Sequence, residues 1–248
     1  MATNPVRVIV WDEAPGHANK TIYPKSLNSV IADALNLDEE IVAVTANQDE
    51  PSQGITQEAL DNADVLIWWG HARHNDVTDE TAELVKAAVL KGMGFVALHS
   101  AHYSKTFKKI LNCTGHLGGG WREGEPPDTE EITVCAPRHP IAEGVEDFVL
   151  DEEEMYGAPF DVPPFETLVF QSYFPVGGEY FPSFTTTVGE GITPDFLSGP
   201  GKGIGRGKGA GRVFYFRPGH EAFGTYHHPM IQRIIRNGVL WTAKRTGV

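Results

Sequence analysis

The chain has 248 residues, of which 41% are hydrophobic and 21% charged, a balance typical of a folded globular protein rather than a disordered one. Its 33 acidic side chains outnumber its 20 basic ones, and the net charge of −13 repels phosphate backbones, so nucleic acid is not an expected partner. No apolar run approaches the length of a membrane span, and the first residues lack a basic and apolar leader, so we expect a cytoplasmic protein without a membrane partner.

The first half of the chain alternates between strand-like and helix-like segments. Apolar runs of strand length occupy residues Val6–Asp12, 40–46, 63–70 and Gly94–His99. Apolar side chains at helical spacing fill residues 23–35. The clearest helix follows the third run, with Thr78 as a suitable N-cap and Gly92 at its end. Because this alternation implies right-handed crossovers, it predicts an α/β fold with a doubly wound, mostly parallel sheet.

The pattern is looser after residue 112. We expect strands at residues 131–136, 166–174 and Gly211–Phe216, and a final helix that begins at Pro229. Residues 182–211 are rich in glycine and show little apolar periodicity. Within them, residues 205–210 fit the GxGxxA dinucleotide pattern, but they precede a strand instead of joining a strand to a helix, which favours a hairpin loop. We expect one domain over residues 1–248.

Histidine and acidic residues follow several of the predicted strands. In open α/β sheets, ligands bind beyond the carboxyl ends of the strands. The segments at these positions supply Asp12, Glu13, His17, His71, His74, His99, His102 and His220. Imidazole with carboxylate suits zinc or a similar divalent metal, and the same groups can act as general acid and base near neutral pH. The sequence therefore predicts a functional site at this edge of the sheet.

The acidic residues 151–154 form a second feature of interest. Glu154 precedes the apolar Met155 and is the one expected to turn inward, whereas Glu152 and Glu153 are expected to lie on a solvated edge. His139, His227 and His228 lie next to prolines and are expected at turns or helix starts.

Neither a serine nor a cysteine nucleophile is expected. Ser100 follows a buried strand, but it lacks the flanking glycines of GxSxG. Cys113 and Cys135 match neither a CxxC motif nor a secreted disulfide framework. Because Cys135 falls within the apolar run of residues 132–136, we expect it to be a small core residue.

Six segments carry a resemblance to a known family. They are VRVIVWDE, DVLIWWGHARH, GFVALHSAHYSK, RHPIAEGV, EEEMYGAPFD and VFYFRPGHE, in this order over most of the chain. Together they resemble the trehalose utilisation, or ThuA-like, family. That family is similar in fold to class I glutamine amidotransferases, so the resemblance implies a three-layer sandwich with a flavodoxin-like sheet. Those amidotransferases carry a cysteine after the fourth strand, where this chain has His99 and Ser100.

The resemblance implies a role in the metabolism of trehalose or related disaccharides, through 3-keto sugars made by a partner sugar 3-dehydrogenase. The leading hypothesis is abstraction of a proton beside the ring ketone, assisted by a divalent metal or a histidine. Return of the proton at another carbon would isomerise the sugar, and loss of the anomeric substituent would cleave the glycosidic bond.

The predicted site residues have three roles. The candidate metal ligands are His71, His99, Glu154 and His220. The candidate catalytic residues are Glu154, His99, Glu13 and His17. The candidate substrate contacts are Trp69, Tyr103, Tyr156 and Arg217.

Two other hypotheses stay open. One is a metal-independent glycoside hydrolase with two carboxylates, such as Glu13 and Glu154, which should then lie roughly 5–10 Å apart. The other is a non-catalytic sugar-binding or regulatory subunit on an amidotransferase-like scaffold, in which tryptophans such as Trp121 stack on sugar rings. We also expect the chain to form a homo-oligomer.

Overall fold

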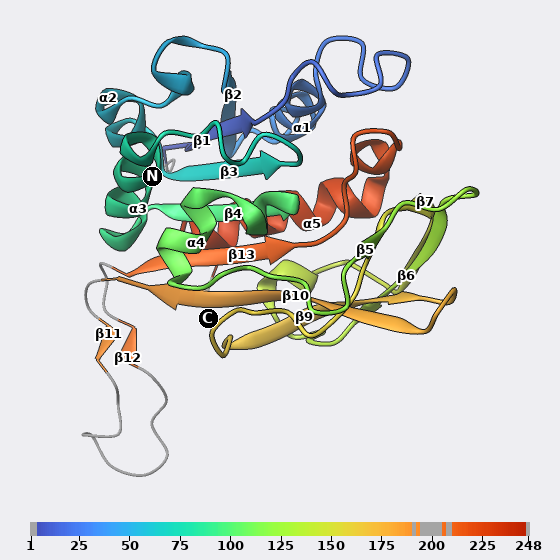
Figure 1. The fold of residues 1–248 in the computed structure, drawn as a ribbon. Helices are drawn as coiled ribbons and strands as arrows, with labels where there is room; N and C mark the ends of the chain where they lie inside the picture. The colour runs from blue at the N-terminus through green and yellow to red at the C-terminus, as the bar shows by residue number, and fades with distance from the viewer. Residues whose placement is uncertain (1–3, 190–191, 194–204, 207–209, 247–248) are drawn as a thin grey trace.

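A nine-stranded sheet, in the order β2-β1-β3-β4-β13-β10-β9-β6-β7, forms the centre of the computed structural model (Figure 1). The structure describes residues 4–189, 192–193, 205–206 and 210–246. The parallel half of the sheet contains β1 (Val6–Asp12), β2 (Ile41–Asn47), β3 (Val65–Gly70), β4 (Gly94–His99) and β13 (Gly211–Phe216). Its order is that of a flavodoxin-like sheet. The predicted doubly wound parallel core is therefore confirmed.

The other half of the sheet is antiparallel. It contains β6 (Asp128–Val134), β7 (Phe148–Glu153), β9 (Thr167–Phe174) and β10 (Glu179–Val188). Residues 182–188, for which the weak apolar periodicity predicted no strand, belong to β10, which pairs with strands on both sides. Short strands β11 (Ile192–Thr193) and β12 (Gly205–Arg206) pair antiparallel, which agrees with a hairpin there, whereas residues 207–209 lie outside the described residues.

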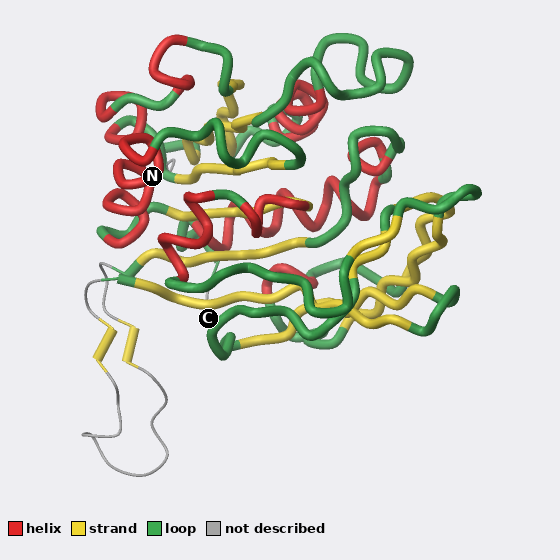
Figure 2. The backbone as a smooth tube through the Cα atoms, in the orientation of Figure 1, coloured by secondary structure: helices red, strands yellow, loops and turns green. Residues whose placement is uncertain are grey.

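Helices cover both faces of the parallel half (Figure 2). On one face lie α1 (Leu27–Leu35) and α5 (Pro229–Thr242), and on the other α2 (Gln57–Asp61), α3 (Asp79–Leu90) and α4 (Lys105–Leu111). The predicted N-cap of α3 is confirmed, since the Thr78 side chain accepts a hydrogen bond from the Thr81 amide. Helix α1 begins later than predicted because Ser26 caps it. Among the described helices, none is long and apolar enough to cross a membrane.

Short elements complete the connections. They are the strands β5 (Trp121–Arg122) and β8 (Met155–Tyr156) and the 3-10 helices Pro51–Gly54, Ser100–Tyr103, Pro140–Ala142 and Thr225–His227. Strand β5 pairs antiparallel with β8, outside the main sheet. His139 and His228 take the structural roles predicted for them, because their side chains cap the helices that begin at Pro140 and Pro229.

Cys135 corrects one expectation about the core. Strand β6 ends at Val134, and although the Cys135 amide still donates to the Val169 carbonyl of β9 at 2.9 Å, its side chain is exposed, like those of Glu131 and Thr133 at alternate positions before it. The apolar run of residues 132–136 therefore belongs only in part to the buried strand.

Candidate functional site

Five side chains converge at the carboxyl ends of the parallel strands. They are His71, His99, Glu154, His220 and Glu221, and we call them the His/Glu cluster. The Nδ1 atom of His71 lies 3.3 Å from Nε2 of His99, and its Nε2 atom lies 3.2 Å from Glu221 Oε1. Glu154 Oε2 lies 3.4 Å from His99 Nε2. The His220 ring stands edge-on to the His71 and His99 rings, with centroids 4.9 and 5.5 Å away. Segments far apart in the sequence thus form one site.

His99 occupies a strained turn at the end of β4. Its backbone has φ 55° and ψ −128°, a conformation that a residue with a Cβ adopts only when its surroundings enforce it. The Tyr215 hydroxyl donates to the His99 carbonyl at 3.1 Å, and the side chain has no exposed surface. A strand, a strained residue and a short helix in succession form the nucleophile elbow of hydrolases. Here the elbow directs an imidazole into the site.

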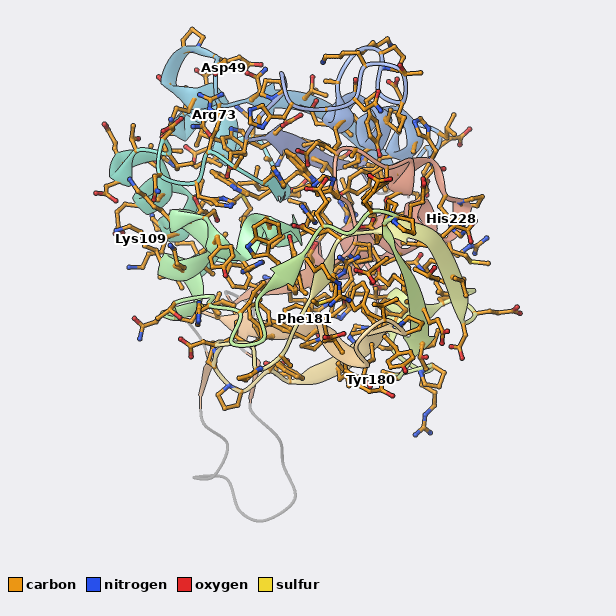
Figure 3. All side chains as sticks on the ribbon, turned by 45° about the vertical axis from the view of Figure 1, so that its right-hand side comes forward. Asp49, Arg73, Lys109, Tyr180, Phe181 and His228 are labelled. Atoms are coloured by element: carbon orange, nitrogen blue, oxygen red, sulfur yellow. The ribbon has the colours of Figure 1, made fainter. Side chains whose placement is uncertain are left out.

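Glu13 holds the loop that carries His71. Its buried carboxylate accepts hydrogen bonds from the amides of His71, at 3.2 Å, and Arg73, and its Oε2 lies 2.6 Å from His74 Nδ1. The Arg73 side chain turns away from the site to Asp49, 2.7 Å away (Figure 3). Since Glu13 is occupied in this way, its place in the structure favours positioning of His71 over the predicted catalytic role.

His17 is a predicted site residue that does not take part in the contacts described above. Its side chain is exposed in the loop after β1. When charged it would lower the pKa of His71, but no hydrogen bond or ion pair joins the two among the residues described. The structure does not bring His17 into the His/Glu cluster.

A buried charge network lies beneath the cluster. The Arg217 guanidinium, predicted to contact substrate, has no exposed surface and donates to Glu130, at 3.0 Å from Nε to Oε1, and to the Glu154 carbonyl. Its Nη2 atom also lies 3.2 Å from Glu153 Oε2. The prediction that Glu153 lies on a solvated edge is wrong, because its side chain is fully buried. Arg217 thus supports the site from behind and has no surface for a sugar.

The predicted aromatic contacts divide into two groups. Trp69 has no exposed surface: its indole donates to the Gly219 carbonyl at 2.9 Å and stacks within 17° of the His71 and His99 rings. It backs the imidazoles instead of forming a wall of the pocket. Tyr103 and Tyr156, by contrast, line a pocket of about 220 Å³. The other residues that line it are His71, His74, Ser100, Trp121, Glu123 and Glu154.

Burial sets the protonation of the cluster. It lowers the pKa of His71 and of His220 to about 4 and holds the pKa of His99 well below its usual value, with repulsion among the rings as a second cause for His71 and His99. Burial raises the pKa of Glu154 to about 8 and that of Glu221 to about 7. The imidazoles are therefore neutral, which is the form that binds metal ions.

The donor set of the cluster fits a divalent metal. His71, His99 and Glu221 each offer a ligand atom within 4.8 Å of the others, and so do His71, Glu154 and His220. The Oε2 atoms of Glu154 and Glu221 are buried and make no hydrogen bond with any residue that the structure describes. All four predicted ligands are brought together. Glu221 was missed, although its place directly after His220 could have indicated it.

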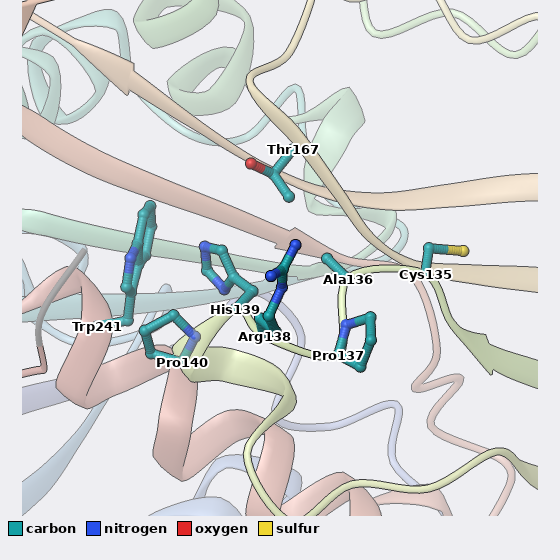
Figure 4. A pocket seen from close by; sticks show the side chains of 8 residues that line it. All are labelled: Cys135, Ala136, Pro137, Arg138, His139, Pro140, Thr167 and Trp241. Carbon is teal, nitrogen blue, oxygen red and sulfur yellow. The ribbon is translucent and has the colours of Figure 1, made fainter. Parts of the chain in front are cut away.

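A second, larger cavity lies elsewhere. It has a volume of about 440 Å³ and lies between the β6–β7 connection, the start of β9 and the end of α5 (Figure 4). Its lining contains Arg138, His139 and Trp241, but no member of the His/Glu cluster.

The flavodoxin-like half-sheet, the helices on both faces and the strained elbow define a class I glutamine amidotransferase-like fold. A glutamine amidotransferase from Thermotoga maritima shares this fold, with a TM-score of 0.53 at 10% identity over 98% of this chain and 100% of that one. Within the class, the chain belongs to the ThuA family, described as trehalose utilisation, whose model matches residues 7–242. The family resemblance noted in the sequence is thereby confirmed.

Solved structures of ThuA-like proteins show the same fold. One from Parabacteroides merdae has a TM-score of 0.65 at 15% identity and covers 99% of this chain and 93% of its own. One from Bacteroides uniformis has a TM-score of 0.60 at 15% identity and covers 98% and 93%. No curated protein matches the chain.

Proposed function

We propose that this protein is an enzyme of disaccharide utilisation that acts on a 3-keto sugar, with a divalent metal ion, zinc or similar, held by the His/Glu cluster. The observation that carries the proposal is the convergence of three neutral imidazoles and two buried carboxylates whose Oε2 atoms make no hydrogen bond within the described part of the chain. Such a donor set is typical of a catalytic metal site with room for a substrate oxygen.

The geometry separates the roles of the two carboxylates. Glu154 lines the pocket, whereas Glu221 does not. We therefore assign His71, His99 and Glu221 as ligands, with His220 beside them, and Glu154 as the base that faces the substrate. When bound, a divalent cation would polarise the ketone and stabilise negative charge on its oxygen.

The remaining residues of the chain orient the sugar and move its proton. Glu154 takes a proton from the carbon beside the ketone in its ionised form: burial raises its pKa to about 8, and a cation bound beside it would lower that pKa again. Ser100 and Tyr156 are hydrogen-bonded to each other at the pocket wall and offer hydroxyl groups to the sugar. Isomerisation follows if the proton returns at another carbon, and glycosidic cleavage follows if the anomeric substituent departs.

The test compares two matched variants. Protein purified without chelator should contain stoichiometric metal by elemental analysis and should convert 3-keto-trehalose. Glu221→Gln should lose metal, whereas Glu154→Gln should keep it and lose both turnover and exchange of the substrate C–H for deuterium in D₂O. Turnover by metal-free protein would favour the two-carboxylate hydrolase instead. Metal and sugar binding without exchange or turnover of any keto derivative would favour the binding subunit.

The proposed substrate also implies a partner enzyme that makes it. A 3-keto sugar must come from a sugar 3-dehydrogenase, so we propose a functional link to such an enzyme. We place the reaction in the cytoplasm, a proposal supported by the two free cysteines Cys113 and Cys135. Assembly as a homo-oligomer stays a proposal as well.

A further inference from the structure

Trp121 differs from every other tryptophan of the chain. Its side chain is 60% exposed and lines the mouth of the site pocket, whereas the other four are at most 1% exposed: Trp11, Trp68, Trp69 and Trp241. A large aromatic side chain beside a polar pocket presents an apolar face to whatever enters.

The backbone around Trp121 is held rigidly against the strand that follows Glu154. Trp121 pairs with Tyr156 in the β5–β8 ribbon, and the Gly119 amide donates to the Gly157 carbonyl at 3.1 Å. The Gly157 amide donates back to the Gly120 carbonyl at 2.9 Å. The backbone that carries the indole is therefore fixed relative to the strand that follows Glu154.

Side-chain alternation explains why Trp121 and Glu123 face the same way. Arg122 lies between them and forms a two-pronged contact with Asp128, at 2.9 and 3.1 Å, away from the pocket. Trp121 and Glu123 both line the pocket, as expected of side chains two positions apart on an extended chain. Glu123 is exposed and makes no ion pair or hydrogen bond within the part of the chain that the structure describes.

We propose that Trp121 and Glu123 form a subsite for the second ring of a disaccharide, whose oxidised ring occupies the pocket beside Glu154. The proposal rests on the proposed function and adds to it that the substrate has two rings. The pocket, at about 220 Å³, is below the range of roughly 300–1,000 Å³ common for ligand sites, so a disaccharide must extend past its mouth. There the indole face would stack on the C–H face of the second ring, and the carboxylate would accept hydrogen bonds from its hydroxyl groups.

Fluorescence quenching provides a direct test. Because the other tryptophans are buried, the emission that acrylamide quenches comes from Trp121, and Trp121→Phe should remove it. In the Glu154→Gln variant loaded with zinc, saturating 3-keto-trehalose should protect this emission from acrylamide, whereas 3-keto-glucose should bind without protecting it. With turnover as the readout, Trp121→Ala should raise the KM for 3-keto-trehalose roughly tenfold and leave that for 3-keto-glucose unchanged.

One control variant and three possible contrary outcomes complete the test of the Trp121 subsite. Tyr180→Ala removes another exposed aromatic side chain, labelled in Figure 3, and should change neither KM. Calorimetric binding of 3-keto-trehalose without protection of Trp121 would overturn the subsite and leave the proposed function intact. Absence of binding by either keto sugar would overturn both. Protection that depends on protein concentration instead of sugar would assign Trp121 to an interface between copies of the chain.

Discussion

One buried residue, Glu153, positions the segments that form the His/Glu cluster. The Glu153 carboxylate accepts hydrogen bonds from the Gly219 amide, at 3.0 Å, from the Thr225 hydroxyl and from the Glu154 amide, at 3.2 Å. It thereby joins the segment that carries His220 and Glu221 to the strand end that carries Glu154. Glu153 is a positioning residue for ligands that come from two distant parts of the chain.

Replacement of Glu153 tests this role. Glu153→Gln keeps the shape but removes one of the two carboxylates that face buried Arg217 and weakens the hydrogen bonds that Glu153 accepts, while Glu130 stays paired with Arg217, so unfolding should become easier by about 1–3 kcal/mol. Zinc affinity should fall as well. Urea unfolding and zinc titration measure the two effects, and Glu152→Gln, at an exposed neighbour, should change neither. Equal behaviour of the two variants would contradict the positioning role.

The buried His102 makes stability depend on pH. Burial lowers its pKa from 6.5 to about 3, so the folded protein keeps this ring neutral while the unfolded chain takes up a proton. The folded-state pKa is depressed, so stability is complete above about pH 6.5 and is lost as the pH falls towards 3, by at most about 1.4 kcal/mol per pH unit. Urea unfolding between pH 7 and 4 should show a shallower decline for His102→Gln than for wild type. The exposed His116→Gln should keep the wild-type slope.

At the scale of elements, the junction between β3 and its loop is closely packed against the site. A Cβ on Gly70 would lie 2.9 Å from Glu13 Oε2 and 3.2 Å from the Ala101 Cα. Gly70→Ala should therefore displace the Glu13 carboxylate, destabilise the fold by about 1–3 kcal/mol and weaken zinc binding. Thermal unfolding and zinc titration provide the measurement. Gly224→Ala, where a Cβ would meet no atom within 4 Å, is the matched control, and an equally mild effect of both would refute the argument.

A comparison of the predicted and observed strands shows which elements the local sequence indicates. The ends of β4 were predicted correctly because a continuous apolar run is bounded by Gly94 and His99. Strand β10 was missed because Pro182 and three threonines, residues 185–187, obscure its apolar alternation, although threonine suits a strand. Strand β7 was missed because it ends in acidic residues. Glu153 is buried only because Arg217 meets it from a distant strand, and no local pattern contains that contact.

Some residues of the candidate site could also be predicted from the sequence, and others could not. Three of the candidate ligands could be predicted from topology, since parallel strands end at one edge of the sheet and His71, His99 and His220 lie at or shortly after such ends. Glu154, which follows the antiparallel β7, was predicted from its place beside the apolar Met155. The roles of Trp69 and Arg217 could not be predicted. Because both faces of β3 and β13 are buried, the sequence of these strands does not indicate which side chains at their ends face a pocket.

At the scale of the whole molecule, the cluster joins the two halves of the sheet. His71, His99 and His220 follow parallel strands, whereas Glu154 follows the antiparallel β7. A metal ion bound by His71, His99 and Glu221 would link three segments of the parallel half beside Glu154 and would stabilise the folded state. At a free zinc concentration 100 times the Kd, the midpoint of thermal unfolding should rise by roughly 5–10 °C. Calorimetry with zinc and with EDTA measures the shift, and His71→Ala, which removes the ligand shared by both candidate sets, should abolish it. A shift of equal size in this variant would place the metal elsewhere.

The elbow at His99 has a consequence for the redesign of this fold. The turn is enforced by packing around it, including the Tyr215 hydroxyl on its carbonyl, and not by the identity of the side chain that it carries. The same backbone frame can therefore present a sulfur nucleophile in one protein and a nitrogen ligand in another. New chemistry on such a scaffold requires exchange of one side chain and its immediate neighbours, while the geometry that aims it is inherited.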